Sequence, residues 1–301
     1  MPGKIVIPGG AGFIGRGLAR QLRSRGFEVT IPSRRAAPDA IAWDGERQGP
    51  WSRELDGALA VINLAGRSVN CRYGEANRRE IYASRLKSTR AVGEAIAACR
   101  VPPRVWLNSS SATIYRHALD RPMDEATGET GKGFSVDVCK QWERTFFEAP
   151  VSCRRVALRT AMVFGNGAGG VYNAFRWLAR LGWAGRLGGG RQYVSWIHED
   201  DLRRAIEWLI EREDLDGVVN VAAPNPLPAA EFLESLRRSI GQPIGLPSTR
   251  WMLEVGAFVL RTETELLVKS RRVVPGRLLE SGFRFQYSEW PEAARALAAV
   301  G

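Results

Sequence analysis

Residues 5–15 read Ile-Val-Ile-Pro-Gly-Gly-Ala-Gly-Phe-Ile-Gly, and this stretch decides the fold of the chain. The apolar run Ile5 to Ile7 is typical of a short buried strand, and the run from Phe27 to Ile31 predicts a second strand. Between them, apolar residues recur at every fourth position, as on one face of a helix that ends before Gly26. They are Ile14, Leu18 and Leu22. The pattern therefore predicts a β-α-β unit, the building block of a parallel sheet.

The loop of this unit carries glycines at positions 9, 12 and 15. Such spacing lets the backbone turn tightly, approach a pyrophosphate and pack the helix on the sheet, while amides of the first helical turn face the anion. An ordinary tight turn between strand and helix is the alternative interpretation. The order of strand, loop and helix favours dinucleotide binding. The residues expected to contact the dinucleotide are Gly9, Gly10, Ala11, Gly12, Phe13, Ile14 and Gly15.

The end of the second predicted strand indicates which dinucleotide is bound. An acidic residue at this place would bond the 2′-hydroxyl of the NAD ribose. The sequence instead has Pro32-Ser33-Arg34-Arg35, with no acid between Glu28 and Asp39. Guanidinium groups pair with the 2′-phosphate of NADP, so this segment favours NADP unless its two arginines are only solvated surface residues.

Further strands and helices extend this unit into a larger α/β domain. Apolar runs at 59–64 and 104–109 predict two more strands, with a long helix from about Glu75 to Cys99 between them. Strands that alternate with helices predict a doubly wound Rossmann sheet of parallel strands. We expect residues 1–165 to form this NADP-binding domain.

The sequence changes character after about Phe164, where glycine-rich loops introduce a mainly helical stretch. We expect residues 166–301 to form a smaller, mainly helical C-terminal domain on the substrate side. A strand near 218–223 is expected to return to the first sheet, so that the two domains are interleaved. The apolar stretch from Trp251 to Leu267 is expected to be a packing face or the contact face of a homodimer.

Composition excludes several classes of protein. The chain has 301 residues, 45% hydrophobic and 25% charged, which is enough to bury a core and is unlike a disordered chain. Its net charge of +11 comes from dispersed arginines without a block of like charges, which argues against a nucleic-acid-binding arm. The four cysteines form no C-x-x-C pair, so neither a disulfide scaffold nor a metal site is predicted. Without a recognisable signal sequence or membrane span, we expect a cytoplasmic protein that binds a small-molecule substrate.

Three motifs resemble the short-chain dehydrogenase/reductase superfamily in its extended, epimerase/dehydratase form. They are Asn63-Leu64-Ala65-Gly66, the stretch Ser109 to Tyr115 (SSSATIY) and the stretch Ser195 to Asp201 (SWIHEDD). Further matches occur along most of the chain, among them Ser84-Arg85 and Trp142-Glu143. This set resembles the atypical YfcH-like subgroup of sugar-nucleotide epimerase-like proteins.

The resemblance implies roles for individual residues. The segment Asn63-Leu64-Ala65-Gly66 would lie along the adenine and ribose of the cofactor, and Ser111 would hydrogen-bond the reacting carbonyl. Further expected cofactor contacts are Arg85, Ser109 and Cys139. The loops around residues 67–80 and 165–195 are expected to shape the substrate pocket.

The usual proton donor of this superfamily, the tyrosine of a Tyr-x-x-x-Lys motif, is absent. None of the six tyrosines has a lysine four residues later, and the resemblance places Ser135 and Cys139 at the two positions. The candidate substitutes are Ser111, Tyr115 and His198, because these groups can polarise a carbonyl or exchange a proton. Each has a structural alternative: a serine that bonds local backbone, a tyrosine that packs, and a histidine at the start of a helix. The alternative for Cys139 is a small core residue.

Together these features predict an NADP(H)-binding oxidoreductase or epimerase-like enzyme that acts on a small carbonyl or nucleotide-sugar substrate. The alternative is a non-catalytic NADP(H)-binding sensor or partner-binding protein, which the missing Tyr-x-x-x-Lys motif would favour. Relatives of the subgroup imply a link of that alternative to cell division. The sequence leaves the substrate, the proton donor and the oligomeric state open.

Overall fold

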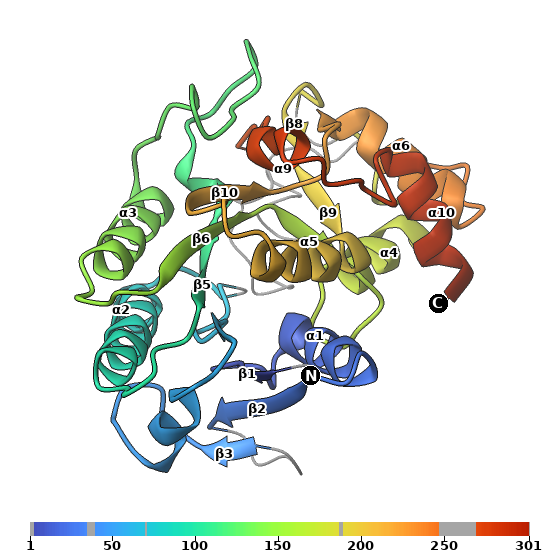
Figure 1. The fold of residues 1–301 in the computed structure, drawn as a ribbon. Helices are drawn as coiled ribbons and strands as arrows, with labels where there is room; N and C mark the ends of the chain where they lie inside the picture. Colours follow the sequence, from blue (N-terminus) through green and yellow to red (C-terminus); the bar gives the residue numbers. More distant parts are fainter. Residues whose placement is uncertain (1–2, 35–39, 70, 187–188, 247–268, 301) are drawn as a thin grey trace.

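A sheet of seven parallel strands organises the molecule (Figure 1). The computed structural model describes residues 3–34, 40–69, 71–186, 189–246 and 269–300. From one edge to the other, the strands are β10 (Gly217–Val221), β6 (Arg154–Thr160), β5 (Val105–Ser111), β4 (Ala60–Asn63), β1 (Lys4–Val6), β2 (Glu28–Ser33) and β3 (Ala40–Ala42). The chain winds outward from β1 to β3 and then, from β4 onward, in the opposite direction. This order confirms the predicted doubly wound Rossmann fold.

Helices cover both faces of the sheet. They are α1 (Phe13–Ser24) and α5 (Glu199–Glu211) on one face, with α2 (Glu75–Ala97) and α3 (Phe134–Phe147) on the other. Successive strand residues point to opposite faces, so Ile5 and Ile7 pack under α1 and α5 while Val6 packs under α2 and α3. Burial on both faces explains why the strands read as continuous apolar runs.

A second region lies beside the carboxyl ends of β6 and β10. Its helices are α4 (Tyr172–Arg180), α6 (Ala229–Ser239), α9 (Gly276–Glu280) and α10 (Trp290–Val300). Its short strands form two ladders, β7 (Met162–Phe164) with β9 (Trp196–His198) and β8 (Tyr193–Val194) with β11 (Leu227–Pro228). The core of the region is aromatic, with the rings of Phe232 and Trp290 stacked 4.0 Å apart.

The two regions share the chain between them. The strand expected near 218–223 is β10, which pairs with β6 in the main sheet, and α5 lies on that sheet although both follow the first elements of the second region. The four short strands of the second region were not predicted, because two- or three-residue strands carry no usable periodicity. The same holds for β3 and for the 3₁₀ turns η1 (Pro50–Leu55) and η2 (Ala112–Ile114).

Two sequence predictions fall where the structure gives no description. Arg35 and the apolar stretch from Trp251 to Leu267 lie outside the described residues. Within the described ranges, no helix has both the length and the apolar character needed to cross a membrane.

Candidate functional site

The glycine loop joins the carboxyl end of β1 to the start of α1. Gly9 has a φ of 78°, and a Cβ atom there would lie 2.6 Å from the backbone nitrogen of Ala65. A Cβ atom on Gly15 would collide with the backbone of Gly10. Packing within the protein therefore requires glycine at both positions, and it brings the loop against the segment that follows β4.

Gly12 is different, because nothing in the protein requires a glycine there. Its φ of −78° suits any residue, and an added Cβ atom would meet only the carbonyl oxygen of Gly9, at 3.6 Å. The helix that starts beside it has no side-chain cap and no acidic residue in its first turn. An uncapped helix start with space for close approach fits the diphosphate of a dinucleotide.

A loop of the second region covers the start of α1. A Cβ atom on Gly167 or Gly170 would come within 2.9 Å of the Phe13 ring, so these glycines let the loop lie directly on the ring. The Arg16 side chain donates to the carbonyl oxygen of Ala168 at 3.1 Å. The structure thereby joins part of the loop 165–195 to the predicted cofactor site.

The predicted selector of the 2′-phosphate lies at the end of β2. Ser33 is its last residue and is buried, while Arg34 follows it and is exposed. The strand runs two residues further than the apolar pattern indicated, and Trp43 donates its backbone amide to the carbonyl oxygen of Ser33 at 3.1 Å. Arg34 is thus free to turn toward a bound phosphate.

A buried amide network fixes the segment after β4. Asn63 donates through Nδ2 to Oδ1 of Asn108 at 2.7 Å and accepts through Oδ1 from the amide of Ala65 at 3.1 Å. Thr89 joins the network from α2 and accepts from the indole of Trp142 on α3 at 2.9 Å. The role of Asn63 in the structure is to hold the turn that meets the glycine loop.

The three serines at the end of β5 face different surroundings. Ser110 is buried and donates to Glu143 Oε1 at 2.6 Å, whereas Ser109 and Ser111 point to the other face of the sheet. Ser111 caps η2: its hydroxyl accepts from the amide of Thr113 at 3.2 Å and donates to the Thr113 hydroxyl at 2.9 Å. Ser111 is only half-buried, so its hydroxyl can exchange the neutral Thr113 partner for a ligand oxygen.

Tyr115 does not fit its predicted catalytic role. The side chain is fully buried, and its hydroxyl donates to Oδ1 of Asn220 at 2.9 Å and accepts from Nη1 of Arg159 at 3.0 Å. Burial raises the pKa of the phenol. The hydroxyl is thus engaged both as a donor and as an acceptor within the core. Tyr115 is therefore a packed core residue, which was the structural alternative to its catalytic role.

His198 also has a structural task. It is 5% exposed, and its Nδ1 accepts the backbone amide of Asp200 at 3.1 Å, which caps α5. Its ring lies 4.1 Å from that of Tyr287, and burial lowers the pKa of the imidazole. The structure thus shows a neutral histidine that begins a helix, with no described contact to Ser111.

Cys139 and Arg85 meet between α3 and α2. Burial raises the pKa of the Cys139 thiol to about 12, so the thiol is protonated and unreactive at neutral pH. Arg85 packs against Gly66 and lies over the Trp142 ring at 5.0 Å, and its Nη1 donates to the carbonyl oxygens of Arg67 and Ile81 at 3.1 Å. Arg85 therefore borders the segment after β4 that is predicted to contact the cofactor.

Sequence reasoning missed a buried polar chain beside these residues. Glu143 and Arg159 form two parallel hydrogen bonds of 2.8 Å, and Arg159 continues the chain through Tyr115 to Asn220. Two signals were available in the sequence. Arg159 is a charged residue within a strand, and Glu143 is a charged residue within an apolar helix face. The partner of neither could be read from the sequence, because Asn220 lies 105 residues after Tyr115.

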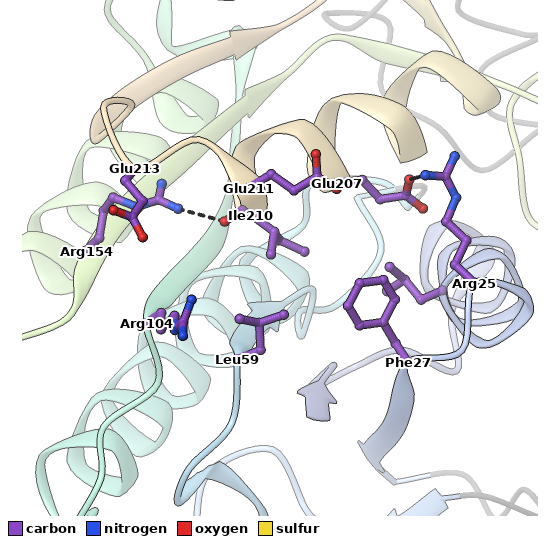
Figure 2. Close-up of a pocket in the computed structure, with 10 residues that line it drawn as sticks. Arg25, Phe27, Leu59, Arg104, Arg154, Glu207, Ile210, Glu211 and Glu213 are labelled. Atoms are coloured by element: carbon purple, nitrogen blue, oxygen red, sulfur yellow. Dashed lines mark hydrogen bonds and ion pairs between the residues drawn. The ribbon is translucent and has the colours of Figure 1, made fainter. Parts of the chain in front are cut away.

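The pocket drawn in Figure 2 lies at the amino ends of the strands, whereas the glycine loop lies at their carboxyl ends. Leu59, Arg104 and Arg154 line it at the amino ends of β4, β5 and β6, and its volume is about 640 Å³. Arg25 pairs with Glu207 at 2.9 Å, and Arg154 donates to carbonyl oxygens near the end of α5. These side chains hold α5 in place, at the edge of the sheet away from the glycine loop.

Comparison with known proteins agrees with this geometry. The model of the NAD dependent epimerase/dehydratase family matches residues 5–222, and that of a domain of unknown function, DUF1731, matches residues 249–297. The chain is 31% identical over 301 residues to Epimerase family protein SDR39U1 of Bos taurus, covering 99% of both chains. It is 30% identical to Epimerase family protein YfhF of Bacillus subtilis, covering 98% of each.

A solved structure is similar over its whole length. It is that of human epimerase family protein SDR39U1 (isoform 2) with NADPH, with a TM-score of 0.89, 28% identity, and coverage of 98% of this chain and 99% of that one.

Proposed function

This chain belongs to the NAD dependent epimerase/dehydratase family, and we propose that it binds NADP(H) and acts as an oxidoreductase or epimerase-like enzyme on a small carbonyl or nucleotide-sugar substrate. The second matching domain confirms the resemblance to the YfcH-like subgroup. The observation that carries the proposal is the uncapped start of α1 beside Gly12, where the backbone leaves room for a diphosphate. The human relative with NADPH supports the choice of dinucleotide.

The residues of the chain divide the work of binding. We propose that Gly9 to Gly15 receive the diphosphate, that Ser33 and Arg34 receive the 2′-phosphate, and that Asn63 to Gly66 line the adenosine side. The Phe13 ring and the loop that lies on it shield this site from water. A guanidinium at position 34 favours the 2′-phosphate over a bare hydroxyl through charge-assisted hydrogen bonds.

Ser111 is the proposed substrate contact. When bound, the reduced nicotinamide would supply a hydride to a carbonyl carbon, and the oxidised nicotinamide would accept one from an alcohol carbon. The Ser111 hydroxyl stands at the carboxyl end of β5 and can turn from Thr113 to polarise the carbonyl oxygen. Because Tyr115 and His198 are held in structural contacts, we assign the proton of the reduced oxygen to water that Ser111 orients.

The binding step is tested with Gly12→Ala. The added methyl group meets no protein atom closer than 3.6 Å, so folding is expected to be unchanged, while NADPH affinity falls at least about tenfold, or ~1.4 kcal/mol. Gly49→Ala is the matched control, since its Cβ atom would also meet its nearest neighbour at 3.6 Å and lies outside the site. Calorimetric titration measures both variants. Equal affinity in wild type and Gly12→Ala would contradict the proposed site.

The cofactor preference has its own test. Titration of wild type with NADPH and NADH is expected to favour NADPH by about tenfold or more, and Arg34→Ala is expected to remove most of that preference. An unchanged preference in the variant would exclude Arg34 as the selector.

The catalytic step is tested by oxidation of NADPH in the presence of aldehydes, ketones and nucleotide sugars. Ser111→Ala is expected to slow turnover about a hundredfold, since one oriented donor to a developing oxyanion contributes on that order. Tight NADPH binding without turnover of any member of the panel would favour the non-catalytic alternative.

Two expectations concern the surroundings of the protein. We propose a cytoplasmic protein whose partner is a small molecule rather than nucleic acid, and which forms a homodimer. Fractionation of the source cells tests the first, and sedimentation of the purified chain tests the second.

A further inference from the structure

The positive charge of Arg85 has no carboxylate partner among the described residues. Among the described residues, Arg85 contacts two backbone carbonyl oxygens and the face of Trp142, and no carboxylate forms an ion pair with it. The titratable groups close enough for their charge to act on it are Cys139, Tyr73 and Cys71, and none of them is a carboxyl group. Arg85 is partly buried, and a cation withdrawn from water is more stable when an anion accompanies it.

A second polar group nearby also lacks a partner. Ser135 is 8% exposed, and its hydroxyl is buried without a hydrogen bond to any described residue. Ser135 lies one turn before Cys139 on the same face of α3, and the Cys139 thiol is near the Arg85 charge. Rotation about one bond redirects the hydroxyl, which can then donate to a ligand oxygen.

This pair of groups is separate from the proposed diphosphate site. The glycine loop meets the segment after β4 at Ala65, whereas Arg85 meets it one residue later, at Gly66. The neighbours of Arg85 on its other sides are α3 and the loop around residues 67–74, which is predicted to shape the substrate pocket. Arg271 also lies near enough to Cys139 to lower the pKa of its thiol, which adds positive potential here.

We propose that Arg85 and Ser135 bind an anionic group of the substrate, a carboxylate or a phosphate. The inference rests on the proposed function, because it places this anion in a complex that already holds NADP(H). The guanidinium presents two parallel N–H donors to such a group, and the serine supplies a third donor. The substrate class is therefore narrowed from carbonyl compounds in general to carbonyl compounds that bear a negative charge.

The test uses matched pairs of probes on the protein saturated with NADP⁺, which cannot reduce them. Pyruvate is compared with methyl pyruvate, and dihydroxyacetone phosphate with dihydroxyacetone, so that the first pair reports on a carboxylate and the second on a phosphate. Calorimetric titration is expected to show that the charged member of at least one pair binds about tenfold more tightly than its neutral partner. The pair that shows the preference identifies the anion.

Variants connect that preference to the two residues. Arg85→Met is expected to reduce it to less than about twofold, Arg85→Lys to retain part of it, and Ser135→Ala to weaken the charged probe severalfold. Arg90→Met is the control, because Arg90 lies on the same helix, is exposed, and its loss changes the net charge equally. Arg90→Met and Ser135→Ala are expected to bind NADP⁺ with wild-type affinity within about threefold.

The outcomes separate the two proposals. If wild type does not bind NADP⁺, the proposed function fails before any probe is added. If NADP⁺ binds but no charged probe is preferred, or if Arg85→Met keeps the preference, the inference about the anion is wrong and the proposed function stands. A loss of NADP⁺ affinity in Arg85→Met comparable to the loss of the probe would assign Arg85 to the cofactor instead.

Discussion

Two partly buried arginines approach the same helix, α3, from opposite sides, and their contacts differ. Arg159, on the β6 side, forms two parallel bonds with Glu143 and a third with Tyr115. Arg85, on the α2 side, contacts carbonyl oxygens and an aromatic face, and no carboxylate in the described part of the chain pairs with it. The charges of both lower the pKa of the Cys139 thiol, so both arginines lie near that residue.

The different partners of Arg159 and Arg85 indicate a structural role for the first and a binding role for the second. A bidentate carboxylate partner satisfies a guanidinium and leaves it nothing to offer a ligand. A guanidinium without such a partner has N–H groups that can still bind a ligand. Arg85 is such a group, and it lies where the predicted cofactor segment meets the predicted substrate loop. The β6 side of α3 is therefore scaffold, and the α2 side is the candidate binding surface.

The largest expected effect is on stability, in a variant that removes Arg159 from the β6 side of α3. Arg159→Met leaves the Glu143 carboxylate buried without a counter-ion, and we expect it to lower the free energy of unfolding by about 3–5 kcal/mol. Arg85→Met in the ligand-free protein is expected to leave that free energy unchanged or to raise it, since it removes a partly buried charge that has no carboxylate partner among the described residues. Urea unfolding of both variants measures the difference. Similar losses in the two would erase the distinction between the arginines.

A smaller effect tests whether Tyr115 belongs to the scaffold. Tyr115→Phe removes one bond from Asn220 and one from Arg159, and we expect the free energy of unfolding to fall by about 1–3 kcal/mol. The rate of NADPH oxidation per folded molecule is expected to match that of wild type. A stable variant that has lost turnover would return Tyr115 to the list of catalytic candidates.

The smallest effect concerns His198 and depends on pH. Burial lowers the pKa of the folded imidazole below its ordinary value of 6.5, so the unfolded chain takes up the proton first as the pH falls. The stability that a neutral His198 provides is present above about pH 6.5 and is lost as the pH falls below that value.

His198→Asn is the matching variant, because asparagine caps a helix but does not titrate. Relative to wild type, we expect it to gain about 1 kcal/mol in the free energy of unfolding between pH 7.5 and pH 5.5. Denaturant titrations at several pH values measure this difference. Parallel pH profiles of the two proteins would show that His198 does not titrate on unfolding.

The sequence predicted five strands of the sheet, though not β3 or β6, and it predicted the glycine loop, because these depend on local patterns. Apolar runs mark β1, β2, β4 and β5, and the glycine spacing is contained in seven consecutive residues. The sequence also indicated NADP, because Ser33-Arg34-Arg35 stands at the end of β2 where an acidic residue would favour NAD. Local chemistry of this kind is visible to periodicity and to motif spacing.

The roles of the polar candidates could not be predicted in the same way. Whether Tyr115 is a catalyst or a core residue depends on Asn220 and Arg159, which only the fold brings to it. His198 was identified together with its helix-capping alternative, and the bond to Asp200 shows that alternative in place. The contrast between Arg85 and Arg159 depends entirely on partners from other elements, so no pattern in the sequence distinguishes them.

The way the chain returns to the main sheet limits how this molecule can be divided. A fragment ending near residue 165 would lack β10 and α5, so β6 would become an open sheet edge and the apolar face that carries Ile5 and Ile7 would lose half of its cover. Such a fragment is expected to aggregate. A chimera that transplants the coenzyme-binding module must therefore extend past β10, and with it carry the loop that rests on Phe13.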